Sequence, residues 1–295
     1  MARHTLAVVG AVVGLCASIA LAAAPTTREV RTGRYDLTFT QRSPLSAPSK
    51  ILARIGWSLA NMQAQGAETD YRLENERFLA YVPAKYRGDE AYGLIVWVSP
   101  GDPPLVRPEW YALFDKHRFI CIAAHRSGNE RSAVVRIGLA LDAAHNCKAI
   151  YNIDPKRVYV AGLSGGGRIS SMTAICFPDV FCGGYYIIGC NYYRSVPMPG
   201  DLTKIYPRSF SSPPGNLLGM AKNQSRHVLL TGDADMNQPQ TKANYEAMKS
   251  DRYRYVTYIQ VPGMGHMPPV GEWFEKGLLA LDAGGGPATR PASGR

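Results

Sequence analysis

The stretch RVYVAGLSGGGRIS, residues 157–170, joins an apolar, β-branched run to a cluster of four glycines around Ser164. The run is typical of a buried strand, and the residues after the glycines continue as a helix. Three structures fit such a junction: a turn that packs helix against strand, a phosphate-binding turn, and a turn that holds a serine up for chemistry.

The residues around Ser164 favour the third structure. A P-loop needs Lys followed by Ser or Thr after its glycines, whereas GRI (167–169) follows here, and G-x-G-x-x-G is matched only loosely. GLSGG (162–166) instead matches G-x-S-x-G between a strand and a helix. Such a sharp turn strains the serine backbone and brings the flanking chain close, which glycine permits. The motif indicates a nucleophile elbow, and a purely structural turn stays open as the alternative.

Strand-like runs alternate with helical stretches from residue 76 onward. Strands are expected within 76–83, 93–100, 118–125, 157–162, 183–190, 226–232 and 254–263, and helices within 130–151, 166–175, 240–250 and 272–283. Alternation of this kind predicts the α/β class, with a mostly parallel sheet covered by helices on both faces.

The N-terminus has the pattern of an export signal. Arg3 precedes an uncharged run, Leu6 to Ala24, and Ala20-Leu21-Ala22 fits a small-x-small cleavage site. We therefore expect residues 1–22 to be a signal peptide, and the protein to be secreted or periplasmic without stable membrane insertion after cleavage. An uncleaved anchor is the alternative, because the run is long enough to span a bilayer.

Three further segments stand apart from the regular pattern. Residues 23–75, with a strand-like and a helix-like part, form an N-terminal extension packed on, or leading into, a main domain at 76–283. Residues 191–224 are rich in Pro, Ser and Gly and read as an irregular insertion. It is a candidate pocket wall, because loops at the carboxyl ends of parallel strands form ligand sites. The tail, residues 284–295, is expected to be disordered.

Charge and cysteine content suggest no nucleic acid and no metal. The formal net charge of +10 falls to about +9 without Arg3, and no nucleic-acid motif accompanies it, so scattered surface charge is the simpler interpretation. Five cysteines remain after residue 22, so at least one stays unpaired. Cys121 lies in an apolar run and reads as a buried hydrophobe. Pairing among the other four stays open, and their spacing matches no zinc site.

A serine nucleophile needs a base that takes its proton. Only His227 and His266 follow Ser164 in the chain, which is the order that the elbow motif requires. His227 opens an apolar strand, whereas His266 lies in the glycine- and proline-rich loop VPGMGHMPP after the last strand. We therefore expect His266 to be the base.

The acid that orients the base should follow the strand between these positions. That strand ends in LLTGDADMN (229–237), which offers Asp233 and Asp235, and the residues alone barely separate the two. An oxyanion would need two backbone N–H donors. Gly165 supplies one, and Gly101 or Asp102 the other, because Pro100 has no N–H.

Taken together, the chain resembles the α/β-hydrolase superfamily, and within it the secreted esterases grouped with polyhydroxybutyrate depolymerases, feruloyl esterases and predicted peptidases. YNIDPKRVYVAGLSGGGR (151–168), FPDVFCGG (177–184), LLTGDADMN (229–237) and VPGMGHMPP (261–269) carry the resemblance. It implies Asp235 as the acid, with Asp233 as the fallback, and it implies an ester substrate and no metal or cofactor. Pro100 departs from the family's usual histidine, which leaves the second oxyanion donor open.

Substrate choice is less defined. Tyr192 and Tyr193 could line an aromatic or sugar site, or could be packing residues, and Arg168 could meet an acidic substrate or cap local carbonyl groups. A serine peptidase of the same fold and a non-catalytic binding protein are the alternative functions. The oligomeric state stays open.

Overall fold

One eight-stranded sheet carries the fold, in the strand order β1-β2-β4-β3-β5-β6-β9-β10. The computed structural model describes Met1 and residues 31–283, so the predicted signal segment, apart from Met1, and the predicted tail lie outside the described residues. The strands of the sheet are β1 (Gly33–Thr38), β2 (Arg77–Val82), β3 (Tyr92–Val98), β4 (Phe119–Ala124), β5 (Ile153–Leu163), β6 (Gly183–Ile187), β9 (Arg226–Gly232) and β10 (Tyr255–Val261). β2 runs antiparallel to β1 and β4, and the other pairings in this sheet are parallel. The predicted mostly parallel sheet is confirmed.

The central strands are apolar along their whole buried length. Every residue of β3 and β4 is buried, and so is β5 from Arg157 onward. Strands covered on both faces are continuous apolar runs, because neither side of the strand meets water. That is why these segments were recognisable from the sequence without any alternation of polar and apolar residues.

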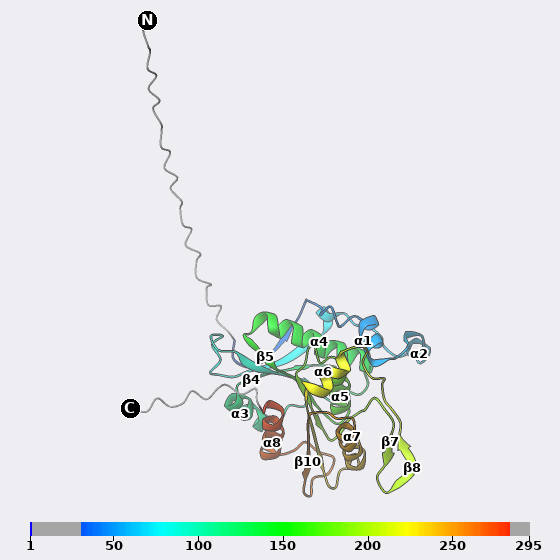
Figure 1. Cartoon of the computed structure of the whole chain (residues 1–295). Coiled ribbons are helices and arrows are strands. Elements are labelled where there is room, and N and C mark those ends of the chain that lie inside the picture. The colour runs from blue at the N-terminus through cyan, green and yellow to red at the C-terminus, as the bar shows by residue number, and fades with distance from the viewer. Residues whose placement is uncertain (2–30, 284–295) are drawn as a thin grey trace. The chain divides into compact units, whose positions relative to one another are not determined.

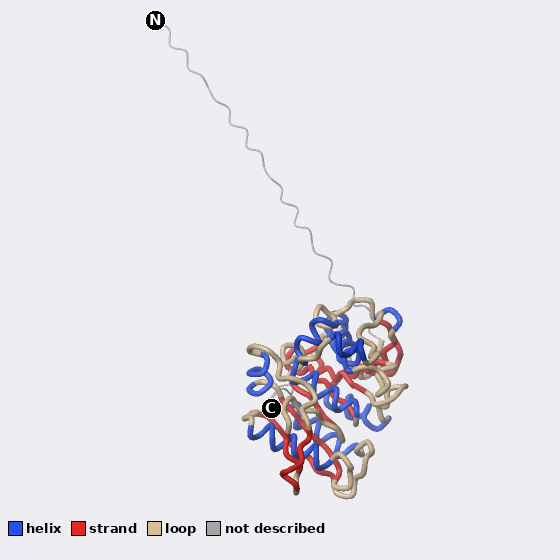
Figure 2. Tube along the Cα trace, turned by 90° about the vertical axis from the view of Figure 1, so that its right-hand side faces the viewer, coloured by secondary structure: helices blue, strands red, loops and turns tan. Residues whose placement is uncertain are grey.

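Helices lie on both faces of the sheet (Figures 1 and 2). The α-helices are α1 (Pro48–Ile55), α2 (Leu59–Ala64), α3 (Pro108–His117), α4 (Ala133–Ile150), α5 (Gly165–Cys176), α6 (Leu217–Asn223), α7 (Gln238–Ser250) and α8 (Gly271–Asp282). α4 and α1 pack on one side, and α3 and α8 on the other. On the α3–α8 side, Trp110 stacks on Phe274 with ring centroids 4.1 Å apart, and Trp97 of β3 packs edge-on against Trp110. This aromatic cluster fixes α8, and with it the loop that enters α8 after β10.

Two segments are more ordered than the sequence indicated. The insertion at residues 191–224 contains a hairpin, β7 (Val196–Met198) with β8 (Asp201–Tyr206), as well as α6, so the expectation of a wholly irregular segment is wrong. Helix α3 was not predicted, because it is short and follows the proline-rich loop after β3. The hairpin is seen at the lower right of Figure 1.

The N-terminal segment is built into the main sheet and helical layer. β1 pairs along its full length with β2, and Gly33 faces Val82 at one end of the pairing. The buried carboxylate of Asp142 on α4 accepts a hydrogen bond from the Ser43 N–H at 2.6 Å and one from the Tyr71 hydroxyl at 2.5 Å. Burial raises the pKa of Asp142, and these donors oppose that rise. The segment between β1 and β2 is thereby pinned to α4.

The five cysteines of the described residues are all free. Cys121 is buried in β4, as the apolar run predicted. In the described part of the chain, no helix has both the length and the apolar character that crossing a membrane would need.

Candidate active site

Ser164 stands at the turn between β5 and α5. Its backbone has φ +53° and ψ −117°, a left-handed conformation that non-glycine residues rarely adopt. The Ser164 N–H donates to the Ile187 carbonyl of the adjacent strand β6 at 2.8 Å, and this bond holds the residue in place. The predicted sharp strand-to-helix turn is therefore present.

The glycines around Ser164 are required for close packing. A Cβ atom on Gly166 would lie 1.9 Å from the Val98 carbonyl oxygen at the end of β3. A Cβ on Gly162 would lie 2.5 Å from the backbone carbon of Gly166. Both contacts are with backbone atoms, which cannot move aside easily, so the elbow closes only because these positions lack a side chain.

His266 meets Ser164 from the loop after β10. Its Nε2 atom lies 2.9 Å from the Ser164 Oγ atom, within hydrogen-bond distance. The imidazole is partly exposed, with 28% of the side chain accessible. An unprotonated Nε2 in this position can accept the hydroxyl proton of Ser164.

Asp235 fixes the other side of the imidazole. Its Oδ1 atom lies 2.7 Å from His266 Nδ1, and the carboxylate is fully buried. The Thr231 hydroxyl donates to Oδ2 at 2.6 Å, and the Asn237 N–H donates to Oδ1 at 3.1 Å. A carboxylate can only accept from Nδ1–H, so it holds the proton there and leaves Nε2 free to act as acceptor.

Asp233 and His227, the other candidate acid and base, form different hydrogen bonds. Asp233 Oδ1 accepts a hydrogen bond from the Gly263 N–H at 2.7 Å, which ties the turn after β9 to the loop after β10. His227 is fully buried, and its Nδ1 atom lies 2.6 Å from the Tyr186 hydroxyl. The side chains of both residues thus have hydrogen-bond partners other than Ser164.

Beside the elbow, a buried arginine organises the loop after β3. Arg136 of α4 donates to the Ser99 carbonyl at 3.0 Å and to Asn129 Oδ1 at 3.3 Å. Asn129 lies directly against Gly165, since a Cβ on Gly165 would meet Asn129 Oδ1 at 1.9 Å. Burial lowers the pKa of Arg136 to about 10, so the side chain is still a cation at neutral pH. Sequence reasoning missed Arg136 and Asn129, because a single arginine on an apolar helix and an asparagine in a loop match no motif.

The backbone donors predicted for an oxyanion lie around this loop. Gly165 is the first residue of α5, so its N–H has no acceptor within the helix. The Gly101 N–H is directed at the Ser99 hydroxyl at 3.4 Å, within its own turn. The Asp102 carboxylate lies 3.5 Å from His125 Nδ1. The loop is thus anchored at both residues.

Arg168 acts as a brace between loops. Its guanidinium donates to three side-chain oxygens: Asn191 at 3.1 Å, Asn237 at 3.1 Å and Gln240 at 2.8 Å. These acceptors belong to the chain after β6, the turn after Asp235 and the start of α7. These three hydrogen bonds favour a structural role for Arg168 over contact with an acidic substrate. Arg168 holds in place the turn that carries Asp235.

The side chains of Tyr192 and Tyr193 are hydrogen-bonded at the end of α7. The hydroxyls of Tyr192 and Tyr193 both donate to Asp251 Oδ2, at 2.7 and 2.6 Å, and Arg194 lies 3.1 Å from the same oxygen. Tyr192 is 2% exposed. These hydrogen bonds join the chain after β6 to the residue that follows α7, and they favour the packing role for both tyrosines. The insertion does line a hollow of about 440 Å³, but this hollow lies between the β7–β8 hairpin and α7.

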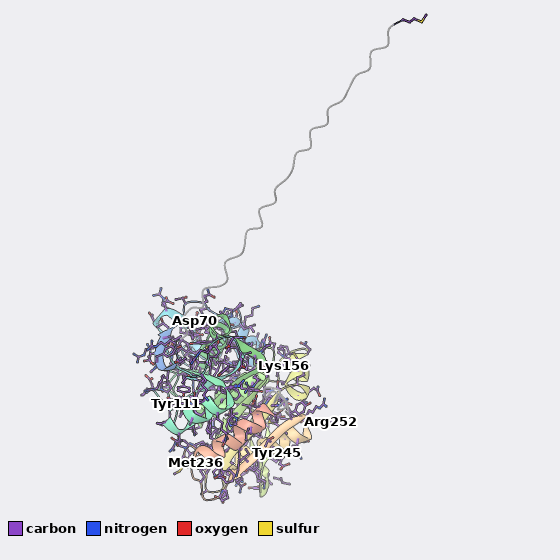
Figure 3. All side chains as sticks on the ribbon, turned by 90° about the vertical axis from the view of Figure 1, so that its left-hand side faces the viewer. Asp70, Tyr111, Lys156, Met236, Tyr245 and Arg252 are labelled. Carbon is purple, nitrogen blue, oxygen red and sulfur yellow. The ribbon has the colours of Figure 1, made fainter. Side chains whose placement is uncertain are left out.

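An exposed apolar side chain lies next to Asp235 in the chain. Met236 follows Asp235 directly and is 77% exposed, and Figure 3 shows it at the molecular surface. Among the described residues, no group of three His, Cys, Asp or Glu side chains is placed to hold a metal ion.

Comparison with known proteins shows two sequence relatives. Poly(3-hydroxyalkanoate) depolymerase C of Paucimonas lemoignei is 35% identical over 112 residues, covering 33% of this chain and 27% of that protein. A poly(3-hydroxybutyrate) depolymerase of Ralstonia pickettii is 30% identical over 109 residues, covering 32% of this chain and 21% of that protein. The chain thus spans about a quarter of the length of these relatives. No protein-family model matches it.

Solved structures identify the fold. A ferulic acid esterase matches with a TM-score of 0.53 at 14% identity, over 85% of this chain and 96% of that chain. An esterase of Pyrobaculum calidifontis matches with a TM-score of 0.50 at 17% identity, over 70% of this chain and 80% of that one. The chain has the α/β-hydrolase fold, and the predicted resemblance to polyhydroxybutyrate depolymerases is confirmed.

Proposed function

We propose that this α/β-hydrolase-fold protein is a serine hydrolase that cleaves carboxylic esters through Ser164, His266 and Asp235. The observation that carries the proposal is the unbroken hydrogen-bonded chain from Ser164 Oγ through both imidazole nitrogens to Asp235, with distances of 2.9 and 2.7 Å. A nucleophile, a base and an orienting carboxylate in this order are what serine catalysis requires.

The reaction would proceed in two acyl-transfer steps. His266 takes the hydroxyl proton while Ser164 Oγ attacks the ester carbonyl, and the resulting imidazolium is stabilised by Asp235. His266 then protonates the leaving alcohol oxygen, which breaks the ester bond and leaves an acyl-serine. Water enters, loses its proton to His266 and releases the acid, which restores the free serine.

The negative charge of the tetrahedral intermediate would be met by backbone donors. Gly165 is one, at the positive end of α5, and Gly101 or Asp102 is the other. Arg136 supports this assignment, since it holds the Ser99 carbonyl and the Asn129 side chain beside Gly165. In acyl-transfer enzymes, a single oxyanion donor lowers the activation free energy by about 2.7–4 kcal/mol.

Esters are favoured over peptides as the substrate class. Both sequence relatives are named as depolymerases of polyesters, and the partial match with them supports carboxylic ester chemistry. We also propose that the protein is exported, on the strength of the charge, the apolar run and the cleavage pattern of residues 1–22.

A substitution at the nucleophile tests the mechanism. Ser164→Ala should abolish hydrolysis of p-nitrophenyl acetate, while far-ultraviolet circular dichroism stays that of the wild type. A fluorophosphonate probe should label the wild type at Ser164 and should not label the variant. Wild-type turnover by Ser164→Ala would exclude the mechanism, and faster cleavage of a matched anilide than of its ester would indicate a peptidase.

A further inference from the structure

A second hollow, of about 480 Å³, lies between the N-terminal segment and the start of α4. This hollow, which we call the α2 pocket, is lined mainly by residues of the α1–α2 turn and of α2. Its lining includes Trp57, Ser58, Asn61, Met62, Gln65 and Ser132. The volume falls in the range of pockets that bind small organic ligands. Figure 1 shows α1 beside α4, and α2 at the right edge of the view.

A short segment of chain joins the α2 pocket to the elbow. Ser132, in its wall, is three residues from Asn129, whose side chain lies against Gly165. On its other side, the Trp57 indole N–H donates to the Ser209 carbonyl of the insertion at 3.1 Å. The loop before α4 therefore lines the pocket at Ser132 and lies against the elbow at Asn129.

The sheet order sets which flank of Ser164 the pocket occupies. The loop after β4, which leads to Ser132, lies on the β4–β3 side of β5. His266 follows β10, which lies on the opposite side of β5, beyond β6 and β9. The loop that leads to the α2 pocket and the loop that carries His266 thus approach Ser164 from opposite sides of β5. Because the base gives its proton to the leaving oxygen, the alcohol departs on the His266 side and the acyl group extends the other way.

The lining of the pocket is neutral, with apolar and polar parts. Met62 is buried, and Trp57 is half-buried, so both present apolar surface. Asn61 and Gln65 contribute amide groups, and the hydroxyls of Ser58 and Ser132 accept from helix N–H groups but keep their protons to donate. None of the described residues that line the pocket is charged. A charged group placed there would find no counter-ion among these lining residues.

We propose that the α2 pocket binds the acyl group of the substrate, and that it selects neutral acyl chains longer than acetyl that carry a hydrogen-bonding oxygen. This inference rests on the proposed ester hydrolysis, which it extends from the reaction to the acyl side of the substrate. Trp57 and Met62 take the carbon chain, and the amide and hydroxyl groups take the oxygen.

An acyl series with a constant p-nitrophenol leaving group tests the proposal. Four p-nitrophenyl esters serve: acetate, octanoate, the similarly long 6-methoxyhexanoate, and the monoester of suberic acid, which is anionic at neutral pH. We expect kcat/KM to be highest for the methoxy ester, lower for octanoate and lowest of the three long esters for the suberate. A kcat/KM for the suberate that equals or exceeds the value for octanoate would overturn the proposal.

Two variants locate the effect. Trp57→Ala should lower kcat/KM for the two neutral long esters by about 10- to 100-fold, a larger factor than for acetate. Asn61→Trp fills the pocket from an exposed helix position and should act in the same direction; Leu59→Trp, on the same helix but outside the pocket lining, is the matched control. A loss shared equally by acetate, or one seen only when the alcohol is varied, would refute an acyl pocket.

A binding measurement separates this proposal from the proposed function. N-methyl-6-methoxyhexanamide, which is neutral and contains no ester, should quench tryptophan fluorescence of the wild type and should not quench that of Trp57→Phe. Quenching without turnover of any ester would remove the proposed function but leave a binding pocket. Turnover without quenching, together with an unchanged acyl series in Trp57→Ala, would remove the pocket and leave the function.

Discussion

Asp233 and Asp235 are separated by a single residue and hold two different parts of the same loop. Asp235 Oδ1 lies 2.7 Å from His266 Nδ1, whereas Asp233 Oδ1 accepts the Gly263 N–H at 2.7 Å. One carboxylate orients the imidazole and the other ties down the chain three residues before it. The two neighbours therefore provide a matched pair for separating catalysis from loop structure.

Asp235→Asn should lower kcat for p-nitrophenyl acetate by roughly 10³- to 10⁴-fold, because an amide no longer stabilises the imidazolium or fixes the tautomer. Asp233→Asn should stay within about 3-fold of the wild type, since the Asn side-chain oxygen still accepts the Gly263 N–H. Steady-state kinetics of both variants, with melting temperatures as the folding control, decide the point. Equal losses would mean that both carboxylates act only through the loop.

The strained backbone of Ser164 predicts that the Ser164→Gly variant is more stable than the Ser164→Ala variant. A left-handed conformation of this kind costs a non-glycine residue of order 1–3 kcal/mol, and glycine adopts it freely. Ser164→Ala keeps the strain and Ser164→Gly releases it. We expect the glycine variant to be about 1 kcal/mol more stable than the alanine variant, after the greater chain entropy of unfolded glycine is subtracted. Urea unfolding of the two inactive variants measures this, and a less stable glycine variant would show that the strain is not stored at this residue.

Arg136 should influence rate more than substrate binding. Arg136→Met removes the donors to the Ser99 carbonyl and to Asn129, which loosens the loop beside Gly165. Supporting residues of this kind typically contribute about 10- to 100-fold to activity, and we expect the loss in kcat with KM nearly unchanged. Arg136→Lys should recover part of it. A change in KM alone would assign Arg136 to the substrate pocket instead.

The sheet and the order of the candidate site residues were predictable because each rests on local signals. Buried strands such as β3 and β4 are continuous apolar runs, and the elbow needs glycine where backbones meet, as at Gly166. Loop position and chain order were enough to favour His266 over His227. These features depend on residues close together in the sequence, or on the fixed topology of parallel sheets.

Side-chain contacts between distant segments were not predictable from the sequence. They decide between the two aspartates and set the partners of Arg168 and Tyr192. Arg168 reaches Asn237 and Gln240 across about 70 positions, and Tyr192 reaches Asp251 across 59. Polar residues near a strand end fit substrate binding and loop bracing equally well until these contacts are known. Only the family resemblance favoured Asp235 in advance, and no sequence signal indicated Arg136.

His227 makes stability depend on pH. The Ala221 carbonyl can only accept, so His227 Nε2 carries the proton and Nδ1 accepts from the Tyr186 hydroxyl. Burial lowers the pKa of His227 from 6.5 to about 4. Between these values the unfolded chain binds a proton that the folded protein excludes. Stability therefore falls as the pH drops from about 6.5 towards 4, by about 2 kcal/mol from this residue between pH 7 and pH 4.5.

His227→Gln isolates the contribution of His227 to the pH dependence of stability. Glutamine can accept a hydrogen bond from Tyr186 and donate one to the Ala221 carbonyl without titrating. Urea unfolding of both proteins at pH 7 and pH 4.5 gives four free energies of unfolding. Other groups titrate alike in the two proteins, so the wild type should lose about 2 kcal/mol more than the variant on acidification. Equal losses in both proteins would mean that His227 is charged in the folded state. The Tyr186 hydroxyl would then face a second donor, and the hydrogen bond between the two side chains could not form as described.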